Sequence, residues 1–176
     1  MDTEIGRLLA SLGSELATTY VIFVSDNGAA GWSVDPPFVR NHGKGTPYEG
    51  GVNVPLIVTG PGISAGSEEA ALVSIVDLFD TVLAMAGVER ADVLPNWVRT
   101  DGISLLPLLV GDPQAPRRDI VFAERFAGSN WAGVAQSGFT TARDAQYKLI
   151  RTIVASTNGE PTRTEELYDL DADPFE

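Results

Sequence analysis

The stretch TTYVIFVSDNG, residues 18–28, sets an uninterrupted apolar run directly before a polar turn. The apolar part, residues 18–24, is rich in β-branched and aromatic side chains that do not alternate with polar ones. This pattern is typical of a strand covered on both faces in a parallel sheet. Ligands of open parallel sheets bind at the carboxyl ends of the strands. We therefore expect Asp26 and Asn27, which follow the run, to lie at such an edge.

Neighbouring segments extend this α/β pattern. Apolar residues at helical spacing predict an N-terminal helix that ends at Gly13, and a second such pattern predicts a helix over residues 75–86 that ends at Gly87. A second apolar run, residues 54–59, predicts another buried strand. Residues 1–110 are thus expected to form an α/β domain with a mostly parallel sheet and flanking helices.

The last part of the chain, residues 111–176, predicts a small antiparallel β subdomain. The pair Asn158 and Gly159 is typical of a tight turn between two strands. Four segments have the residue types of strands: residues 119–124, 137–143, 147–154 and 165–170. The predicted fold class is therefore α/β with a C-terminal antiparallel annex.

Charge and composition argue against several kinds of partner. With 12 basic and 24 acidic residues the chain carries a formal charge of −12 at pH 7, and a field of that sign repels phosphate backbones and anionic lipid headgroups. We therefore expect neither nucleic acid nor membrane as a partner. No apolar run is long enough to span a membrane and the N-terminus lacks a signal-peptide pattern, so no localisation is predicted. The sequence has no cysteine, which excludes disulfides and a cysteine nucleophile within it.

Asp26 and Asn27 are candidate metal ligands. A carboxylate and an amide oxygen on one tight turn suit a hard cation such as Ca²⁺ or Mg²⁺, which takes oxygen ligands. The alternative is a plain turn, because Asp and Asn stabilise turns through bonds to their own backbone. The two residues alone favour the plain turn.

Residues 41–51, NHGKGTPYEGG, form a second candidate, which we call the lysine loop. Glycines on both sides of Lys44 leave room for its ammonium and the neighbouring N–H groups to approach an oxyanion. The loop is therefore a candidate anion-binding loop. The alternative is an exposed lysine in a flexible loop.

Together these segments resemble the C-terminal half of the sulfatase family, whose members belong to the alkaline-phosphatase-like superfamily. The lysine loop, which runs through Gly43-Lys44-Gly45-Thr46 into Tyr48-Glu49-Gly50-Gly51, is the most specific element of the resemblance. The other matching segments follow in the family's order: residues 25–28, 51–58, 76–81, 86–87, 101–105, 166–170 and 173–174. The resemblance implies the latter part of the catalytic α/β domain followed by a small β subdomain.

The resemblance also implies roles for the candidate residues. Asp26 and Asn27 would be two ligands of the active-site divalent metal, usually calcium, and Lys44 would contact the sulfate oxygens. His42, which matches no fixed position of the family's loop, is a weaker candidate for a substrate or leaving-group contact, the alternative being a histidine at the loop surface. The implied reaction is metal-dependent hydrolysis of a sulfate ester, with a small molecule or a sulfated glycan as substrate. Phosphoester and phosphonate ester hydrolysis in the same superfamily is the nearest alternative.

The family's nucleophile motif is missing from this sequence. Sulfatases use a formylglycine made from the first residue of Cys/Ser-x-Pro-x-Arg, and this chain has no cysteine and no serine in that pattern. We therefore expect the chain to be inactive alone. A hypothesis of another class is a non-catalytic module that self-associates through an exposed sheet edge.

Two further features have alternative interpretations. Trp32, Trp97 and Trp131 either line an aromatic substrate pocket or, as we favour, serve as partly buried anchors. Residues 160–176 contain seven acidic side chains. We expect these side chains to form a solvated face, with a metal or partner site as the alternative.

Overall fold

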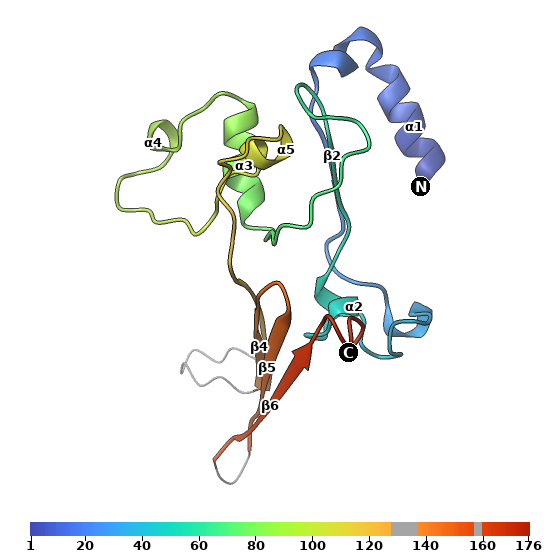
Figure 1. Cartoon of the computed structure of the whole chain (residues 1–176), viewed down its shortest axis with the longest axis vertical. Helices are drawn as coiled ribbons and strands as arrows, with labels where there is room; N and C mark the ends of the chain where they lie inside the picture. Colours follow the sequence, from blue (N-terminus) through green and yellow to red (C-terminus); the bar gives the residue numbers. More distant parts are fainter. Residues whose placement is uncertain (128–136, 157–159) are drawn as a thin grey trace. The chain divides into compact units, whose positions relative to one another are not determined.

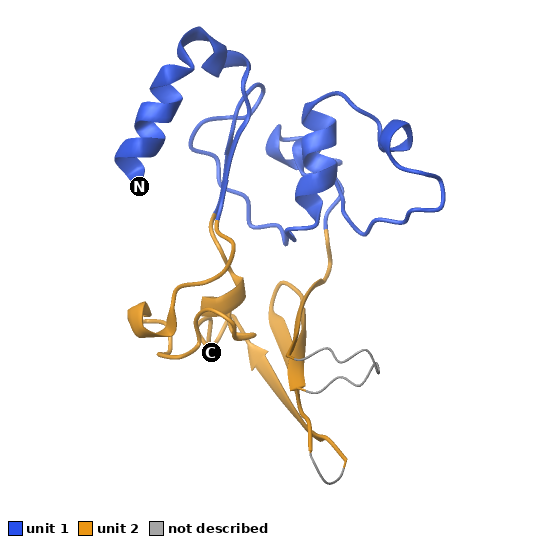
Figure 2. Cartoon of the chain, turned by 180° about the vertical axis from the view of Figure 1, so that it is seen from behind, with its two compact units in different colours: residues 1–24, 56–117 blue, residues 25–55, 118–176 orange. Residues whose placement is uncertain are grey.

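The computed structural model describes residues 1–127, 137–156 and 160–176. Its backbone contacts divide the chain into two compact units (Figure 2). Unit 1 contains residues 1–24 and 56–117, and unit 2 contains residues 25–55 and 118–176. The domain boundary expected near residue 110 stays a prediction. The turn expected at Asn158 and Gly159 lies outside the described residues.

Unit 1 contains the two helices that the sequence predicted (Figure 1). Its elements in chain order are α1 (Asp2–Ser11), the 3₁₀ helix η1 (Gly13–Thr18), β1 (Val21–Val24), β2 (Leu56–Thr59), α3 (Asp77–Met85), α4 (Arg90–Val93) and α5 (Leu106–Leu109). Gly13 and Gly87 follow α1 and α3 closely and have φ values of +52° and +67°. Glycine adopts this left-handed conformation without the cost that a Cβ imposes. The predicted helix ends are therefore confirmed.

β1 and β2 pair antiparallel, so the mostly parallel sheet predicted from the sequence is wrong for the described strands. Val24, the last residue of β1, pairs with Leu56, the first residue of β2. The chain thus leaves β1 and enters β2 at the same end, whereas a parallel partner needs a crossover to the opposite end. Phe23 is 39% exposed and its cross-strand partner Ile57 is 61% exposed. The apolar runs therefore do not form strands covered on both faces in this chain.

Buried polar groups tie α3 to the segment that leads into α5. Asp77 and Thr81 are both 0% exposed. The carboxylate of Asp77 accepts hydrogen bonds from the amides of Ser74 and Ile103 over 2.8 and 2.9 Å. The hydroxyl of Thr81 donates to the Asp77 carbonyl over 2.7 Å and accepts from the Leu105 amide over 2.8 Å. The buried side chains of Asp77 and Thr81 thus find hydrogen-bond partners, as a stable interior requires.

Unit 2 contains the predicted four-stranded antiparallel sheet, in the order β3-β4-β5-β6. Its strands are β3 (Val121–Ala127), β4 (Ser137–Arg143), β5 (Tyr147–Val154) and β6 (Thr162–Asp169). The four predicted strand segments are therefore confirmed, with shifts at the ends of the first and last. Successive side chains of a strand point to opposite faces. Lys148 and Ile150, both buried, lie on one face of β5, which we call the inner face, and the exposed Leu149 lies on the other.

The remainder of unit 2 is the long connection between β1 and β2. Residues 25–55 contain the 3₁₀ helix η2 (Gly31–Ser33) and the short helix α2 (Glu49–Val52), and otherwise form loops. Side chains of the sheet reach this connection: Arg125 bonds to Gly45 and Lys148 bonds to Glu49. The annex sheet and the lysine loop therefore belong to one packed unit.

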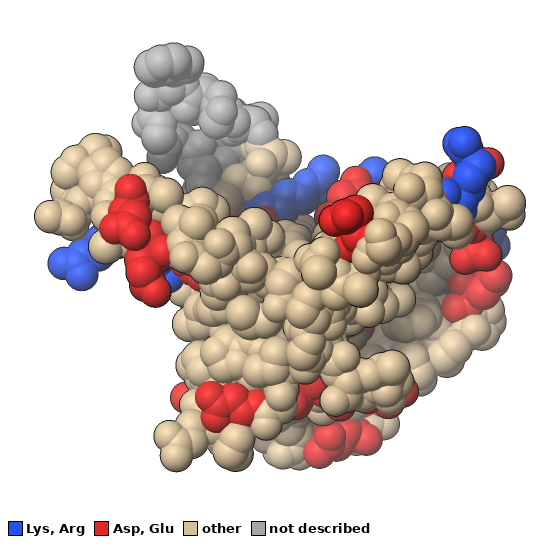
Figure 3. Space-filling view, turned by 90° about the horizontal axis from the view of Figure 1, so that it is seen from above, with Lys and Arg blue, Asp and Glu red and all other residues tan. Residues whose placement is uncertain are grey.

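The surface of the molecule tests the predictions made for the tryptophans and for membrane-spanning segments. Trp32 and Trp97 are 82% and 81% exposed, so neither is the partly buried anchor that we favoured, and Trp131 lies outside the described residues. Charged side chains form separate small groups on the face seen in Figure 3. None of the helices in the described part of the chain has the length and apolar character needed to cross a membrane.

Candidate functional site

Backbone hydrogen bonds join the segment after β1 to the lysine loop. The amide of Gly28 donates to the carbonyl of Gly51 over 3.0 Å, and the amide of Lys44 donates to the carbonyl of Ala29 over 2.7 Å. The peptide of Lys44 therefore lies beside a residue only three positions after Asp26. Two of the sequence motifs that we singled out separately thus meet in unit 2.

Glycines make this close approach of backbones feasible. A Cβ at Gly51 would lie 2.5 Å from the carbonyl oxygen of Thr46 and 2.6 Å from that of Gly43. A Cβ at Gly28 would overlap the carbonyl of Gly50. Real Cβ atoms do not approach backbone oxygens this closely, so the interlocked loops need residues without side chains at these positions.

The turn at Asp26 and Asn27 is partly held by its own backbone. The amide nitrogen of the Asn27 side chain donates to the carbonyl of Gly28 over 3.0 Å, and the hydroxyl of Ser25 donates to the carbonyl of Asn27 over 2.8 Å. These local bonds are those of the plain-turn alternative. They leave the Asn27 side-chain oxygen and the exposed Asp26 carboxylate as donor atoms for a cation.

The donor set fits a divalent cation in kind but not in number. Ca²⁺ takes roughly six to eight oxygen ligands, and this turn offers one carboxylate and one amide oxygen. Within the described residues, no group of three or more His, Cys, Asp or Glu side chains is arranged to hold a metal ion. The assignment of Asp26 and Asn27 as metal ligands therefore stays a prediction.

Lys44 is exposed while its backbone is fixed. The next residue, Gly45, has a φ of +84°, and its carbonyl accepts a hydrogen bond of 2.5 Å from the guanidinium of Arg125 on β3. A second cationic side chain thus lies against the lysine loop, which the sequence reasoning did not identify. The loop is anchored on both sides of Lys44, by Ala29 and by Arg125.

His42 packs flat on Tyr48 within the lysine loop. The ring centroids are 3.6 Å apart and the ring planes differ by 8°. Nδ1 of His42 lies 3.1 Å from the backbone oxygen of Glu176. Since that oxygen can only accept, Nδ1 carries the proton, and in the neutral ring Nε2 carries the lone pair. These two contacts fix the ring within unit 2, and its role stays a prediction.

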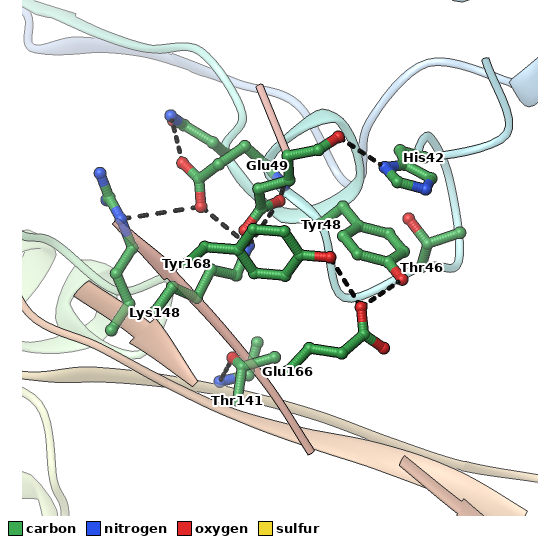
Figure 4. A network of polar contacts seen from close by, with 12 residues as sticks. His42, Thr46, Tyr48, Glu49, Thr141, Lys148, Glu166 and Tyr168 are labelled. Carbon is green, nitrogen blue, oxygen red and sulfur yellow. Dashed lines mark hydrogen bonds and ion pairs between the residues drawn. The ribbon is translucent and has the colours of Figure 1, made fainter. Parts of the chain in front are cut away.

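Two tyrosines share one carboxylate beside this ring (Figure 4). The hydroxyls of Tyr48 and Tyr168 donate to the same oxygen of Glu166, over 3.2 and 2.7 Å. The hydrogen bond to Glu166, together with burial, raises the pKa of Tyr168 above its ordinary value. Burial and the charge of Glu166 raise the pKa of Tyr48. Both phenols are therefore held in the neutral form.

A buried ion cluster lies at the start of α2 (Figure 4). Nζ of Lys148 is 2.9 Å from Glu49 Oε1 and 3.0 Å from Glu176 Oε1. Lys148 is 1% exposed and Glu49 is 3% exposed. Nε of Arg143 lies 3.6 Å from the same Glu49 oxygen and contributes a second positive charge. The two carboxylates are thus faced by two cations.

Sequence reasoning missed this cluster and the tyrosine pair. The solvated acidic face expected over residues 160–176 is wrong for Glu166 and Glu176, which bond inside unit 2. One signal could have identified Lys148: it shares the alternation of β5 with Ile150, so a lysine was placed on the apolar face and needed a buried acidic partner.

Comparisons with known proteins identify one family. The family model described as Sulfatase matches residues 1–88. Arylsulfatase A of Homo sapiens is 37% identical over 127 residues, which cover 69% of this chain and 24% of that protein. A solved structure of a relative with its substrate, D-glucosamine-2-N,6-O-disulfate, is 27% identical with a TM-score of 0.67 and covers 99% of this chain and 32% of that one. The phosphonate monoester hydrolase of Agrobacterium radiobacter is 26% identical with a TM-score of 0.72, over 99% of this chain and 33% of that one.

The coverages and TM-scores show how much of each relative this chain corresponds to. The chain spans between 24% and 33% of the length of these three relatives. The structural likeness extends over nearly all of the chain, which confirms a mixed α/β architecture common to these proteins. The family model matches half of the chain, and the match includes both the turn after β1 and the lysine loop. The chain therefore belongs to the sulfatase family.

Proposed function

We propose that this chain carries a metal-binding and sulfate-binding part of a sulfuric ester hydrolase. The observation that carries the proposal is the pair of backbone hydrogen bonds from Gly28 to Gly51 and from Lys44 to Ala29. They hold the segment that contains Asp26 against the lysine loop, so a carboxylate and an ammonium start from adjacent backbone. Membership of the sulfatase family supports the same assignment.

Each proposed residue has a role that its chemistry allows. Asp26 and Asn27 would offer a carboxylate and an amide oxygen to Ca²⁺ or Mg²⁺. A cation bound there supplies positive charge to the oxygens of the sulfate. The ammonium of Lys44 would bind a peripheral sulfate oxygen, where negative charge increases as the ester bond breaks. His42, with its ring protonated, would donate from Nε2–H to the leaving-group oxygen, because Nδ1–H is bonded to Glu176.

The reaction also needs a nucleophile that these residues do not supply. Sulfatases use formylglycine, and no Cys/Ser-x-Pro-x-Arg motif occurs in the 176 residues. Loss of a nucleophile costs many orders of magnitude in rate. We therefore expect the chain by itself to leave a chromogenic aryl sulfate intact in the presence of calcium. Turnover that disappears in Lys44→Met would overturn this expectation.

A manganese titration followed by NMR tests the metal part of the proposal. Mn²⁺ takes the same oxygen ligands as Mg²⁺ and Ca²⁺, and its unpaired electrons broaden the signals of nearby amides even when binding is weak. We expect the amides of residues 26–29 and 43–46 to broaden first. Asp26→Asn should abolish this broadening, whereas Asp171→Asn, in the acidic C-terminal segment, should leave it unchanged.

The sulfate part has its own readout. Sodium sulfate added to the metal-loaded chain should shift the amides of Lys44 and Gly45, and Lys44→Met should remove the shift because it removes the ammonium but keeps the side-chain length. Sulfate shifts that survive in Lys44→Met would contradict the sulfate part of the proposal. In the manganese titration, broadening that is strongest over residues 160–176 would contradict the metal part.

A phosphonate or phosphate ester hydrolase is the second candidate. The observation in its favour is the TM-score of 0.72 with the phosphonate monoester hydrolase, over 99% of this chain. Both kinds of substrate present a tetrahedral oxyanion, which the same cation and lysine could bind. The NMR titration with phenylphosphonate in place of sulfate separates the two candidates: tighter binding of phenylphosphonate would favour the second.

A non-catalytic role through self-association is a third proposal. The exposed pair Phe23 and Ile57 on β1 and β2 supports it, because exposed apolar side chains that lie side by side favour association. Size-exclusion chromatography with light scattering should show a concentration-dependent oligomer. Phe23→Ser with Ile57→Ser should reduce it, and a wild-type monomer at every concentration would contradict the proposal.

A further inference from the structure

The ion cluster in unit 2 joins three segments that are far apart in the sequence. Glu49 is the first residue of α2, Lys148 lies on β5, and Glu176 follows β6. The bond between Lys148 and Glu49 spans 99 residues and that between Lys148 and Glu176 spans 28. Well-packed apolar residues often give equal or greater stability than buried ion pairs do. A buried ion cluster is therefore weak evidence for added stability, but its bonds do fix the segments that carry them relative to one another.

The cluster fixes both ends of α2. The carboxylate of Glu176 accepts a 2.6 Å hydrogen bond from the backbone amide of Glu49, the first amide of the helix. The side chain of Tyr48, which precedes the helix, does not cap it. The side chain of Glu176, 127 positions away from Glu49, caps the helix instead. Asn53, which follows the helix, donates to Glu49 Oε2 over 2.9 Å. A four-residue helix is not stable by itself, so these bonds hold it in place.

The position of α2 determines the position of the lysine loop. Gly51, inside α2, accepts the hydrogen bond from Gly28, and its Cα faces the carbonyls of Gly43 and Thr46 without space for a side chain. Glu176 also reaches the loop directly, because its backbone oxygen bonds to His42. A displacement of α2 would therefore move the backbone on both sides of Lys44.

We infer that Glu176 and Lys148 are positioning residues, which act through Glu49 and α2 to fix the backbone from which Lys44 projects. That the position of Lys44 matters for sulfate binding rests on the proposed function. The coupling of Glu176 and Lys148 to the lysine loop through α2 does not. The acidic C-terminal segment and the annex sheet thus have a specific role, which is to set the geometry of the lysine loop.

Amide hydrogen exchange of the 176-residue chain tests the coupling. In Glu176→Ala the amide of Glu49 loses its acceptor, and we expect the amides of Gly28, Lys44 and Glu49 to exchange about tenfold or more faster, the range expected for a lost buried acceptor. The amides of β4 and β5 should exchange within about twofold of the wild-type rate, because Lys148 still pairs with Glu49.

Two matched variants complete the test. Glu176→Gln keeps an oxygen that can accept from the Glu49 amide, so it should restore most of the slow exchange of the loop. Arg151→Met removes an exposed ion pair with Glu165 on the opposite face of β5, and it should change neither the loop nor the sheet. If Glu176→Ala does not fold, Asn53→Ala loosens the other end of α2 without removing a charge and should also accelerate the loop amides.

Two results would overturn the inference. One is wild-type exchange of the loop amides in Glu176→Ala or Asn53→Ala. The other is an equal acceleration of loop and sheet amides in a variant that folds, which would reduce the cluster to a contribution to overall stability. Because exchange is measured without metal, sulfate or turnover, a failed manganese or sulfate titration would count against the proposed function alone.

Discussion

The hydroxyl of Tyr168 donates a hydrogen bond of 2.7 Å to Oε2 of Glu166, two residues earlier on the same face of β6. The hydroxyl of Tyr48 adds a second bond to that oxygen, so a single carboxylate joins β6 to the lysine loop. Ionisation of either phenol would place a second negative charge beside the carboxylate. The hydrogen bond to Glu166, followed by burial, raises the pKa of Tyr168, and burial, followed by the charge of Glu166, raises the pKa of Tyr48.

The raised pKa values predict how stability depends on alkaline pH. A group whose pKa is higher in the folded state stabilises the fold fully below its unfolded pKa, about 10 for tyrosine. That contribution is lost as the pH rises from there through the folded pKa. We therefore expect the free energy of unfolding to fall above about pH 10. Chemical unfolding with urea at a series of pH values measures it, and Tyr168→Phe should remove part of the slope.

Replacing Glu166 separates the two causes of these pKa shifts. In Glu166→Gln the pKa of Tyr168 should fall most, because its hydrogen bond to Glu166 is the largest cause, whereas Tyr48 keeps the effect of burial. Ultraviolet absorbance of the phenolate, assigned with single Tyr→Phe variants, follows the two ionisations. Glu165→Gln, which changes the neighbouring carboxylate on the opposite face, is the control. Equal titration curves for Glu166→Gln and the wild type would contradict this account.

Removing the hydroxyl of Thr81 should lower the free energy of unfolding of unit 1. Thr81→Val has nearly the same shape but removes the acceptor of the buried Leu105 amide. An unsatisfied buried donor costs about 1–3 kcal/mol, so the midpoint of urea unfolding should fall accordingly. Thr81→Ser keeps the hydroxyl and loses a methyl group, for which about 1 kcal/mol is expected. A valine variant no less stable than the serine variant would show that the hydroxyl is unimportant.

The elements that the sequence predicted correctly depend on neighbouring residues. Gly13 and Gly87 end their helices where a left-handed residue is needed, and the β-branched and aromatic residues over 147–154 indicate β5. The direction in which β1 and β2 pair was wrong, because it depends on where the connection over residues 25–55 returns, and a run of apolar residues contains no information about that. Likewise, no local pattern connects Glu49 with Lys148 across 99 residues.

Replacing the buried Lys148 should lower the free energy of unfolding more than replacing the exposed Arg151 on the same strand. Lys148→Met keeps the length of the side chain but leaves the buried carboxylates of Glu49 and Glu176 without their closest cation. Breaking a buried pair in this way costs about 3–5 kcal/mol. Arg151→Met breaks an exposed pair on the same strand, and its cost should be at most about 1 kcal/mol. Urea unfolding followed by circular dichroism compares them, and similar losses in the two variants would argue against a buried cluster.

Replacing Gly51 with alanine should displace the backbone of the lysine loop and lower the stability of the chain. The methyl group of Gly51→Ala would lie 2.5 and 2.6 Å from two backbone oxygens, those of Thr46 and Gly43. Backbone must therefore move, at a cost of about 1–3 kcal/mol, and the amide signal of Lys44 should shift in the NMR spectrum. Gly6→Ala is the control: it lies in α1 with open space around its Cα and should stabilise the chain by about 0.5–1 kcal/mol. If Gly51→Ala left both the stability and the Lys44 signal unchanged, the interlocked glycines would not be what holds Lys44 beside Ala29.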